Sequence, residues 1–145
     1  MEKFRAFRIH SEHDKVSGRL VEAQLEELSA GEVVFWTEYS SVNFKDALAA
    51  TGAGGKIMRK FPLIGGIDAA GTVTSSSDGR FKPGDAVICT SYEFGVGHDG
   101  GYSRYCRVPA DWVVPMPRGL TLFEAMALGT AGYAAGLAIE LLELT

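Results

Sequence analysis

Apolar and charged residues alternate from Phe4 to Ile9, and this period of two predicts a β-strand. The stretch from Gly31 to Val42 is rich in β-branched and aromatic residues, which favour a longer strand. Further strands are predicted at 18–25, 67–73, 86–89, 102–108 and 112–114, with turns between them. A chain with many strands and few helices is typical of a barrel or a sandwich, so we expect a mainly β fold with peripheral helices.

The period changes at Asn43, where apolar residues fall at helical spacing until the glycine-rich segment 52–55 ends the helix. Asn43 suits the N-cap of this helix, and Asp46 lies at the third helical position, where a carboxylate complements the helix dipole. A second helical region runs from 121 to 144. It begins with a capping box at Thr121 and Glu124, and a break at 129–132 predicts two helices there.

The composition is that of a globular domain, with 46% hydrophobic and 22% charged residues in 145 positions, enough for one core. A net charge of −4 argues against a nucleic-acid surface. No run approaches the roughly 20 apolar residues of a membrane span, and the N-terminus has no signal-peptide core. Cys89 and Cys106 are interpreted as reduced, buried thiols. We therefore expect a cytoplasmic protein without membrane or nucleic-acid partners.

Four motifs in order carry a family likeness: SVNFKDAL at 41–48, FPLIGGIDAAGTV at 61–73, PGD at 83–85 and GTAGY at 129–133. The set resembles the medium-chain dehydrogenase/reductase superfamily, in particular its zinc-independent quinone oxidoreductases and acryloyl-CoA reductases. The resemblance implies a GroES-like partial β-barrel, the N-terminal domain of alcohol dehydrogenases. It also implies that residues 1–128 are a catalytic domain and that 129–145 lead into a Rossmann domain, before which the chain is truncated.

The departures from the zinc enzymes of that superfamily are specific. Asn43 stands where they have a zinc-ligating cysteine, and Ile67-Asp68 stands where they have His-Glu. Isoleucine has no ligand atom for a tetrahedral zinc site. The cysteines of a structural zinc lobe are also missing between Cys89 and Cys106, and the three histidines are scattered. The sequence therefore predicts an enzyme without a metal.

The resemblance implies an oxidoreductase that uses NADPH to reduce the double bond of a quinone, an enone or an enoyl thioester such as acryloyl-CoA, a small-molecule substrate. It implies catalytic roles for Asn43 as a hydrogen-bond donor and for Asp46, which would orient it. The expected cofactor contacts are Asn43, Phe44, Thr130 and Tyr133, and the expected substrate contacts are Tyr92 and Arg104. A structural role as helix cap is equally open for Asn43 and Asp46, and Asp68 is expected to bond neighbouring backbone amides.

None of the three glycine clusters, at 52–55, 95–101 and 129–136, has the G-x-G-x-x-G arrangement of a dinucleotide loop, and 95–101 is interpreted as a hairpin loop. We therefore expect the chain alone to be inactive, with the complete NADPH site formed only with the missing domain. The resemblance implies a homodimer for the full-length protein. The alternative is a non-catalytic GroES-like barrel for binding or assembly, which would need an exposed, mobile loop.

Overall fold

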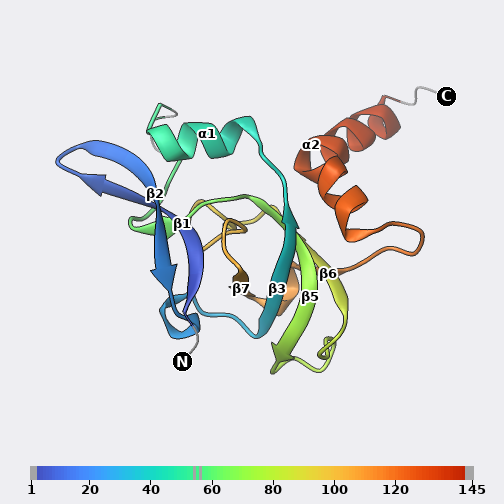
Figure 1. Cartoon of the computed structure of the whole chain (residues 1–145). Coiled ribbons are helices and arrows are strands. Elements are labelled where there is room, and N and C mark those ends of the chain that lie inside the picture. The colour runs from blue at the N-terminus through green and yellow to red at the C-terminus, as the bar shows by residue number, and fades with distance from the viewer. Residues whose placement is uncertain (1–2, 54, 56, 143–145) are drawn as a thin grey trace.

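A computed structural model describes residues 3–53, 55 and 57–142 of the chain (Figure 1). The expectation of a mainly β fold with peripheral helices is confirmed. The elements are, in order, β1 (Phe4–Glu12), β2 (Lys15–Ala23), the 3-10 turn η1 (Leu25–Glu27), β3 (Val33–Ser40), α1 (Phe44–Thr51), β4 (Leu63–Ile64), β5 (Asp68–Ser76), β6 (Ala86–Thr90), β7 (Tyr105–Val108), the 3-10 turn η2 (Ala110–Trp112), β8 (Val113–Pro115) and α2 (Leu122–Leu141).

The larger sheet is antiparallel and has the strand order β7-β3-β5-β6-β8. Its central strands β3 and β5 pair from Val33 opposite Ser76 to Ser40 opposite Ala69, with two register shifts. The inward-facing residues of this sheet form the main hydrophobic core together with Phe94 from the loop after β6, and they include Val33, Phe35, Val73, Val87 and Val108. This pairing places the end of β3 beside the start of β5.

A smaller sheet has the order β2-β1-β4, and it buries a second cluster around Phe4 and Ile64. The two-residue strand β4 was not predicted, because a pair of apolar residues carries no readable period. Residues 102–104 join the two sheets, since the Phe7 N–H donates to the Tyr102 carbonyl at 2.8 Å and the Thr37 N–H to the Arg104 carbonyl at 2.9 Å. The strand predicted at 102–108 therefore begins only at Tyr105.

The glycine-rich segment 95–101 is largely buried and packs against the backbone of Gly65 and Gly66. The Gly101 N–H donates to the Gly66 carbonyl at 2.8 Å, and a Cβ at Gly100 would lie 2.2 Å from the same oxygen. These glycines allow a close backbone approach. The strands on either side of the segment, β6 and β7, are not neighbours in the sheet, so the interpretation of 95–101 as a hairpin loop was wrong.

Helix α1 lies at one end of the barrel and contacts β2 (Figure 1). As predicted, it begins after Asn43, and it ends at Gly52 with a left-handed φ of 74°. Ala49 turns inward and joins Ile9, Met58 and Leu63 in a third buried cluster. The predicted stop segment 52–55 includes residue 54, which lies outside the described residues.

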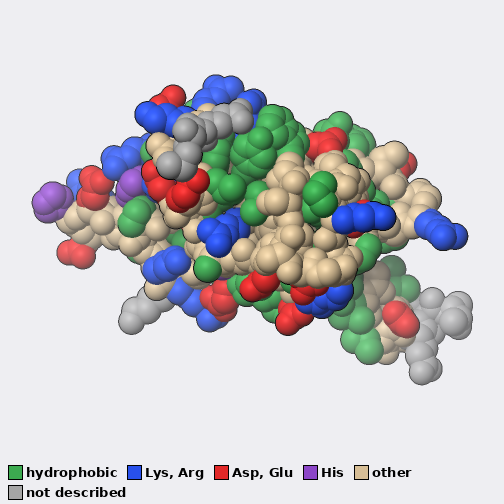
Figure 2. Space-filling model, turned by 90° about the horizontal axis from the view of Figure 1, so that it is seen from below, with side chains coloured by type: hydrophobic (Ala, Val, Ile, Leu, Met, Phe, Trp, Pro, Cys, Tyr) green, Lys and Arg blue, Asp and Glu red, His purple; other side chains and the backbone are tan. Residues whose placement is uncertain are grey.

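Helix α2 begins with the predicted capping box, in which the Glu124 carboxylate accepts from the Thr121 N–H at 2.8 Å. Gly129 has non-helical angles (φ 51°, ψ −161°), which confirms a break near this residue. Beyond the break the helix projects from the barrel (Figure 1), and hydrophobic side chains gather at that end in Figure 2. Seven large apolar side chains of its region are exposed: Phe123, Leu128, Tyr133, Leu137, Ile139, Leu141 and Leu142.

By length and composition alone, α2 is long and apolar enough to cross a membrane. The expectation that no run of the chain reaches this length was therefore wrong. The expectation of no membrane partner stays a prediction.

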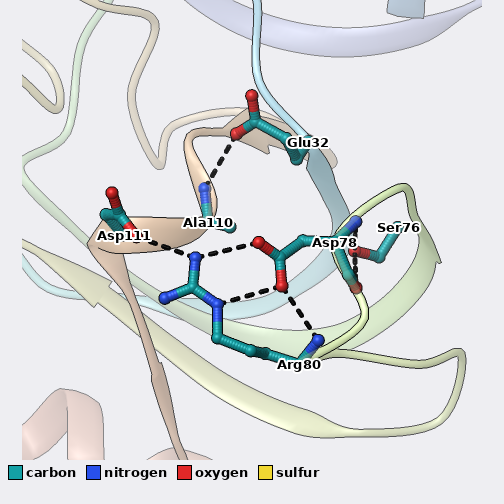
Figure 3. Close-up of polar contacts among 6 residues, drawn as sticks. All are labelled: Glu32, Ser76, Asp78, Arg80, Ala110 and Asp111. Carbon is teal, nitrogen blue, oxygen red and sulfur yellow. Dashed lines mark hydrogen bonds and ion pairs between the residues drawn. The ribbon is translucent and has the colours of Figure 1, made fainter.

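An ion-pair cluster at the surface ties the turn after β5 to η2 (Figure 3). Arg80 Nη2 lies 2.9 Å from Asp78 Oδ2 and 2.7 Å from Asp111 Oδ1. The Glu32 carboxylate accepts from the Ala110 N–H at 3.0 Å in the same region. These contacts fix loops at the surface, and Asp111 also lines the groove described below.

Candidate functional site

The junction between β3 and α1 places Asn43 and Asp46 together, because the extended backbone of Asn43 (φ −113°) starts the helix. Asp46 is 5% exposed. Its Oδ2 accepts from the Asn43 N–H at 2.8 Å, and its Oδ1 accepts from the Ile67 N–H at 3.0 Å. Asp46 thereby holds the backbone of Asn43 against the segment that enters β5.

The side chain of Asn43 makes a different contact. Its Nδ2 donates to Oδ2 of Asp68 at 2.9 Å. Asp68 is fully buried at the first position of β5, and the Thr130 N–H also donates to its Oδ2 at 2.9 Å while the Thr130 hydroxyl donates to its Oδ1. Three donors thus converge on one buried carboxylate, as a buried charge requires. We call Ser41, Asn43, Asp68, Gly129 and Thr130 the Asp68 cluster.

Gly129 makes this convergence possible because the break in α2 turns the Thr130 N–H toward Asp68. With φ at 51°, its backbone has a conformation that residues with a side chain rarely adopt. A Cβ there would lie 2.7 Å from Ser41 Oγ and 2.8 Å from Asp68 Oδ2. Ser41 adds a second link to α2, since its hydroxyl donates to the Met126 carbonyl at 2.7 Å.

Tyr102 supports the cluster from the side of the smaller sheet, because its hydroxyl donates to the Ser41 carbonyl at 3.1 Å. Burial and the nearby Asp46 and Asp68 carboxylates raise the pKa of Tyr102 well above its usual range. The phenol therefore acts as a neutral donor. Sequence reasoning missed Tyr102, whose only local signal is its place after two glycines.

A largely apolar groove of about 600 Å³ reaches the Asp68 cluster at Gly129. Tyr92 and Trp112 form part of its wall and stack with their rings parallel and offset, with ring centroids 5.4 Å apart and an interplanar angle of 3°. Tyr133 of α2 also lines the groove. The backbone of Tyr92 has a φ of 51°, a strained conformation for a residue with a Cβ.

The remaining residues that were expected at the site lie apart from one another. Phe44 is 80% exposed at the start of α1. The Arg104 guanidinium lies 4.8 Å from the ring centroid of Trp36, and Arg104 is not among the residues that line the groove. The structure thus gathers Asn43 and Thr130 at Asp68, and Tyr92 and Tyr133 along the groove.

Ile67, which the resemblance places where the zinc enzymes have a histidine ligand, is 7% exposed and has no ligand atom. Within residues 3–53, 55 and 57–142, no group of three or more His, Cys, Asp or Glu residues is placed to hold a metal ion. Cys89 and Cys106 are free and buried, as expected, and burial raises the pKa of the Cys106 thiol to about 12.

A family model for the alcohol dehydrogenase GroES-like domain matches residues 29–118. The chain is 51% identical over 140 residues, 97% of its length, to YhfP of Bacillus subtilis, a protein named as a quinone oxidoreductase. It is 49% identical over 132 residues, 91% of its length, to the acrylyl-CoA reductase AcuI of Ruegeria pomeroyi. The chain spans 42% of the length of YhfP and 40% of that of AcuI.

Solved structures give the same picture. The chain superimposes with a TM-score of 0.95 on the structure of Bacillus subtilis YhfP that contains NAD. The superposition covers 99% of the chain and 44% of YhfP, at 48% sequence identity. The YhdH oxidoreductase of Salmonella enterica in complex with NADP gives a TM-score of 0.92, with 96% of the chain and 43% of that protein covered at 42% identity. These matches bear out the expected GroES-like barrel.

Proposed function

This chain belongs to the family of the alcohol dehydrogenase GroES-like domain, and from that premise we propose that it is the catalytic-domain portion of a zinc-independent, nicotinamide-dependent oxidoreductase. The proposed reaction is reduction of the double bond of a quinone, an enone or an enoyl thioester such as acryloyl-CoA. The observation that supports it most is the identity of about one half to YhfP and AcuI over more than nine tenths of the chain.

Asn43 is the residue to which we assign the chemistry. When a double bond conjugated to a carbonyl accepts hydride at its β-carbon, negative charge develops on the carbonyl oxygen. A fixed donor aimed at that oxygen stabilises the transition state more than the ground state. Asn43 is partly exposed, and a side-chain amide nitrogen carries two N–H groups, so one is available after the other has bonded Asp68. In this proposal Asp46 holds the Asn43 backbone in place.

The residues around the Asp68 cluster fit a nicotinamide, which supplies the hydride from its ring when it is bound. Phe44 offers an exposed aromatic face, and the side-chain oxygen of Asn43 offers an acceptor for the N–H of a carboxamide. The Thr130 N–H and hydroxyl are both used on Asp68, so Thr130 would contact a cofactor only as an acceptor or through its methyl group. We propose that Tyr133 lies along the same cofactor.

The groove between Tyr92 and Tyr133 suits the apolar part of a substrate, and the stacked Tyr92–Trp112 pair offers a flat wall to a conjugated system. In our proposal Tyr92 contacts the substrate. Arg104 is retained only for a more distant part of the substrate, such as the charged end of a thioester carrier, because it does not line the groove.

A metal ion has no part in this proposal, because Asn43 and Ile67 occupy two positions that hold ligands in the zinc enzymes and isoleucine has no ligand atom. The YhfP structure contains NAD and the YhdH structure contains NADP, so relatives support a nicotinamide cofactor of either kind. The preference for NADPH, the homodimer, the cytoplasmic location and residues 129–145 as the start of a nucleotide-binding domain stay predictions. Residues 143–145 lie outside the described part of that segment.

The alternative of a non-catalytic barrel is less well supported, since segment 95–101 is packed against Gly65 and Gly66 and does not offer the exposed loop that this function needs.

The experiment that tests the proposed function is a chimera in which residues 1–145 replace the matching part of Ruegeria pomeroyi AcuI. We expect this chimera to oxidise NADPH with acryloyl-CoA or a quinone, as AcuI prepared in parallel does with acryloyl-CoA. A folded chimera that binds NADPH but reduces neither compound would overturn the proposal. The isolated chain of residues 1–145 serves as the matched sample without a nucleotide-binding part, and we expect no turnover from it.

A further inference from the structure

We infer that Asp68 is a positioning residue that fixes the side-chain amide of Asn43 so that it presents an N–H donor to the carbonyl oxygen of the substrate. The reference to a substrate rests on the proposed function. The fixed orientation of the amide is a property of the chain itself and is tested without catalysis.

The orientation follows from the contacts of Asp68. Its Oδ2 accepts hydrogen bonds from Asn43 Nδ2 and from the Thr130 N–H, both at 2.9 Å. An ionised carboxylate has no N–H or O–H group and therefore acts only as an acceptor. Asn43 must meet it with a donor, so the amide turns its nitrogen toward Asp68. The flipped amide would place two acceptor oxygens against each other in a fully buried position, at a large cost in free energy.

The two carboxylates near Asn43 bind different groups of this residue. Asp46 bonds the Asn43 N–H and the Ile67 N–H, both of which are backbone groups. Asp68 bonds the Asn43 side chain. Removing Asp46 would therefore disturb the start of α1, whereas removing Asp68 would release the amide group and leave the helix start intact.

Asp99 provides an internal comparison for a purely structural carboxylate. It also accepts three hydrogen bonds, from the Ser29 N–H at 2.8 Å, the Ser29 hydroxyl at 2.9 Å and the Ile64 N–H at 2.9 Å. All of its donors belong to loops and strands of the barrel. The donors of Asp68 are Asn43 and Thr130, both of which were expected at the site from the sequence. The equal number of bonds makes Asp99 a control for loss of stability alone.

The chain allows a direct measurement, because Asn43 is its only asparagine and Gln24 its only glutamine. In the ¹⁵N-labelled chain, the side-chain NH₂ groups of these two residues therefore give the two amide pairs of the spectrum. We expect the two Asn43 protons to be well separated in chemical shift and slow to exchange with water, since one donates to a buried carboxylate. The Gln24 pair should resemble a free amide.

Three variants test whether Asp68 fixes the Asn43 amide: Asp68→Leu, Asp68→Asn and Asp99→Leu. In Asp68→Leu the Asn43 pair should collapse toward the Gln24 pair. In Asp68→Asn it should keep its separation, because the new carbonyl oxygen accepts from Asn43 and Thr130 while its NH₂ donates to the Thr130 hydroxyl. Asp99→Leu should lower stability and leave the Asn43 pair unchanged.

An Asn43 pair that stays unchanged in Asp68→Leu, or one that moves equally in Asp99→Leu, would overturn the inference. If Asp68→Leu does not fold, the spectrum of the unsubstituted chain tests the inference. Asn43 NH₂ protons with the same chemical-shift separation and exchange rate as those of Gln24 would contradict a fixed amide. These outcomes are independent of the AcuI chimera. An inactive chimera with a fixed Asn43 amide refutes the proposed function and leaves the positioning by Asp68 standing.

Discussion

Asn43 Nδ2 lies 2.9 Å from Asp68 Oδ2, although 25 positions separate the two residues in the chain. The contact joins the start of α1 to the start of β5, and Thr130 of α2 closes it from a third element. One buried carboxylate of β5 therefore fixes the start of α1 relative to α2, the two segments that carry the expected site residues Asn43 and Thr130.

Removing the Asn43 amide should reduce the catalytic rate and leave the fold intact. In the AcuI chimera, we expect Asn43→Ser to lower kcat by roughly 10- to 100-fold, somewhat below the usual loss for an oxyanion donor, because water can partly replace it. Serine still caps a helix, so the start of α1 should persist. Steady-state kinetics with NADPH and acryloyl-CoA measure the effect, with Lys45→Ala on the exposed side of α1 as the control. Equal rates in the two variants would contradict a role for Asn43 in the reaction.

Gly129 should tolerate no side chain. We expect Gly129→Ala to destabilise the chain by about 1–3 kcal/mol, because its left-handed backbone strains alanine and the new Cβ meets Ser41 Oγ and Asp68 Oδ2. Gly136→Ala is the matched control in the same helix, since a Cβ there meets nothing within 4 Å, and it should be neutral or stabilising by up to about 1 kcal/mol. Urea unfolding of both variants gives the comparison. A Gly129→Ala chain as stable as the Gly136→Ala chain would refute the strain at the break.

The Asp78–Arg80 pair predicts a pH-dependent contact at the surface (Figure 3). Hydrogen bonds from the Arg80 side chain and backbone lower the pKa of Asp78 from 3.8 to about 2. Because the pKa of the folded state is lowered, the contact is fully present above about pH 4 and is lost as the pH falls through about 2. NMR titration should return the pKa of Asp78 toward 3.8 in Arg80→Met and leave it low in Asp111→Asn. A low value in both variants would mean that Arg80 is not the cause.

The two cysteines should be unreactive in the folded chain. Both are buried, and burial raises the pKa of each thiol, so little thiolate forms at pH 8 and a reagent cannot reach it. We expect a thiol reagent such as DTNB to label neither residue until denaturant is added, and both thereafter. Lys45→Cys, which places a thiol on the exposed side of α1, should react at once under native conditions. Rapid native labelling of the unsubstituted chain would show that the core around β6 and β7 opens readily.

The sequence by itself determined the local elements and much of the family. Alternation and β-branched residues located β1, β3 and β6, and the capping residues Asn43 and Thr121 located the starts of both helices. The glycines at 129–132 also indicated where α2 breaks. These signals are readable because they depend on groups within a few residues of each other, such as a capping side chain and the first free N–H groups of its helix.

Only the tertiary structure decided which residues meet. Asp68 follows Ile67 in an apolar strand, and nothing near it in the sequence indicates that Thr130, 62 positions away, donates to it twice. The sequence also did not indicate three other features: the stacking of Tyr92 on Trp112, the hydrogen bond from Tyr102 to Ser41, and the position of Arg104 outside the groove. Such contacts depend on strand order, on register and on the turn of the backbone at Gly129. These are set by the burial of the whole core, to which each local segment contributes only a part.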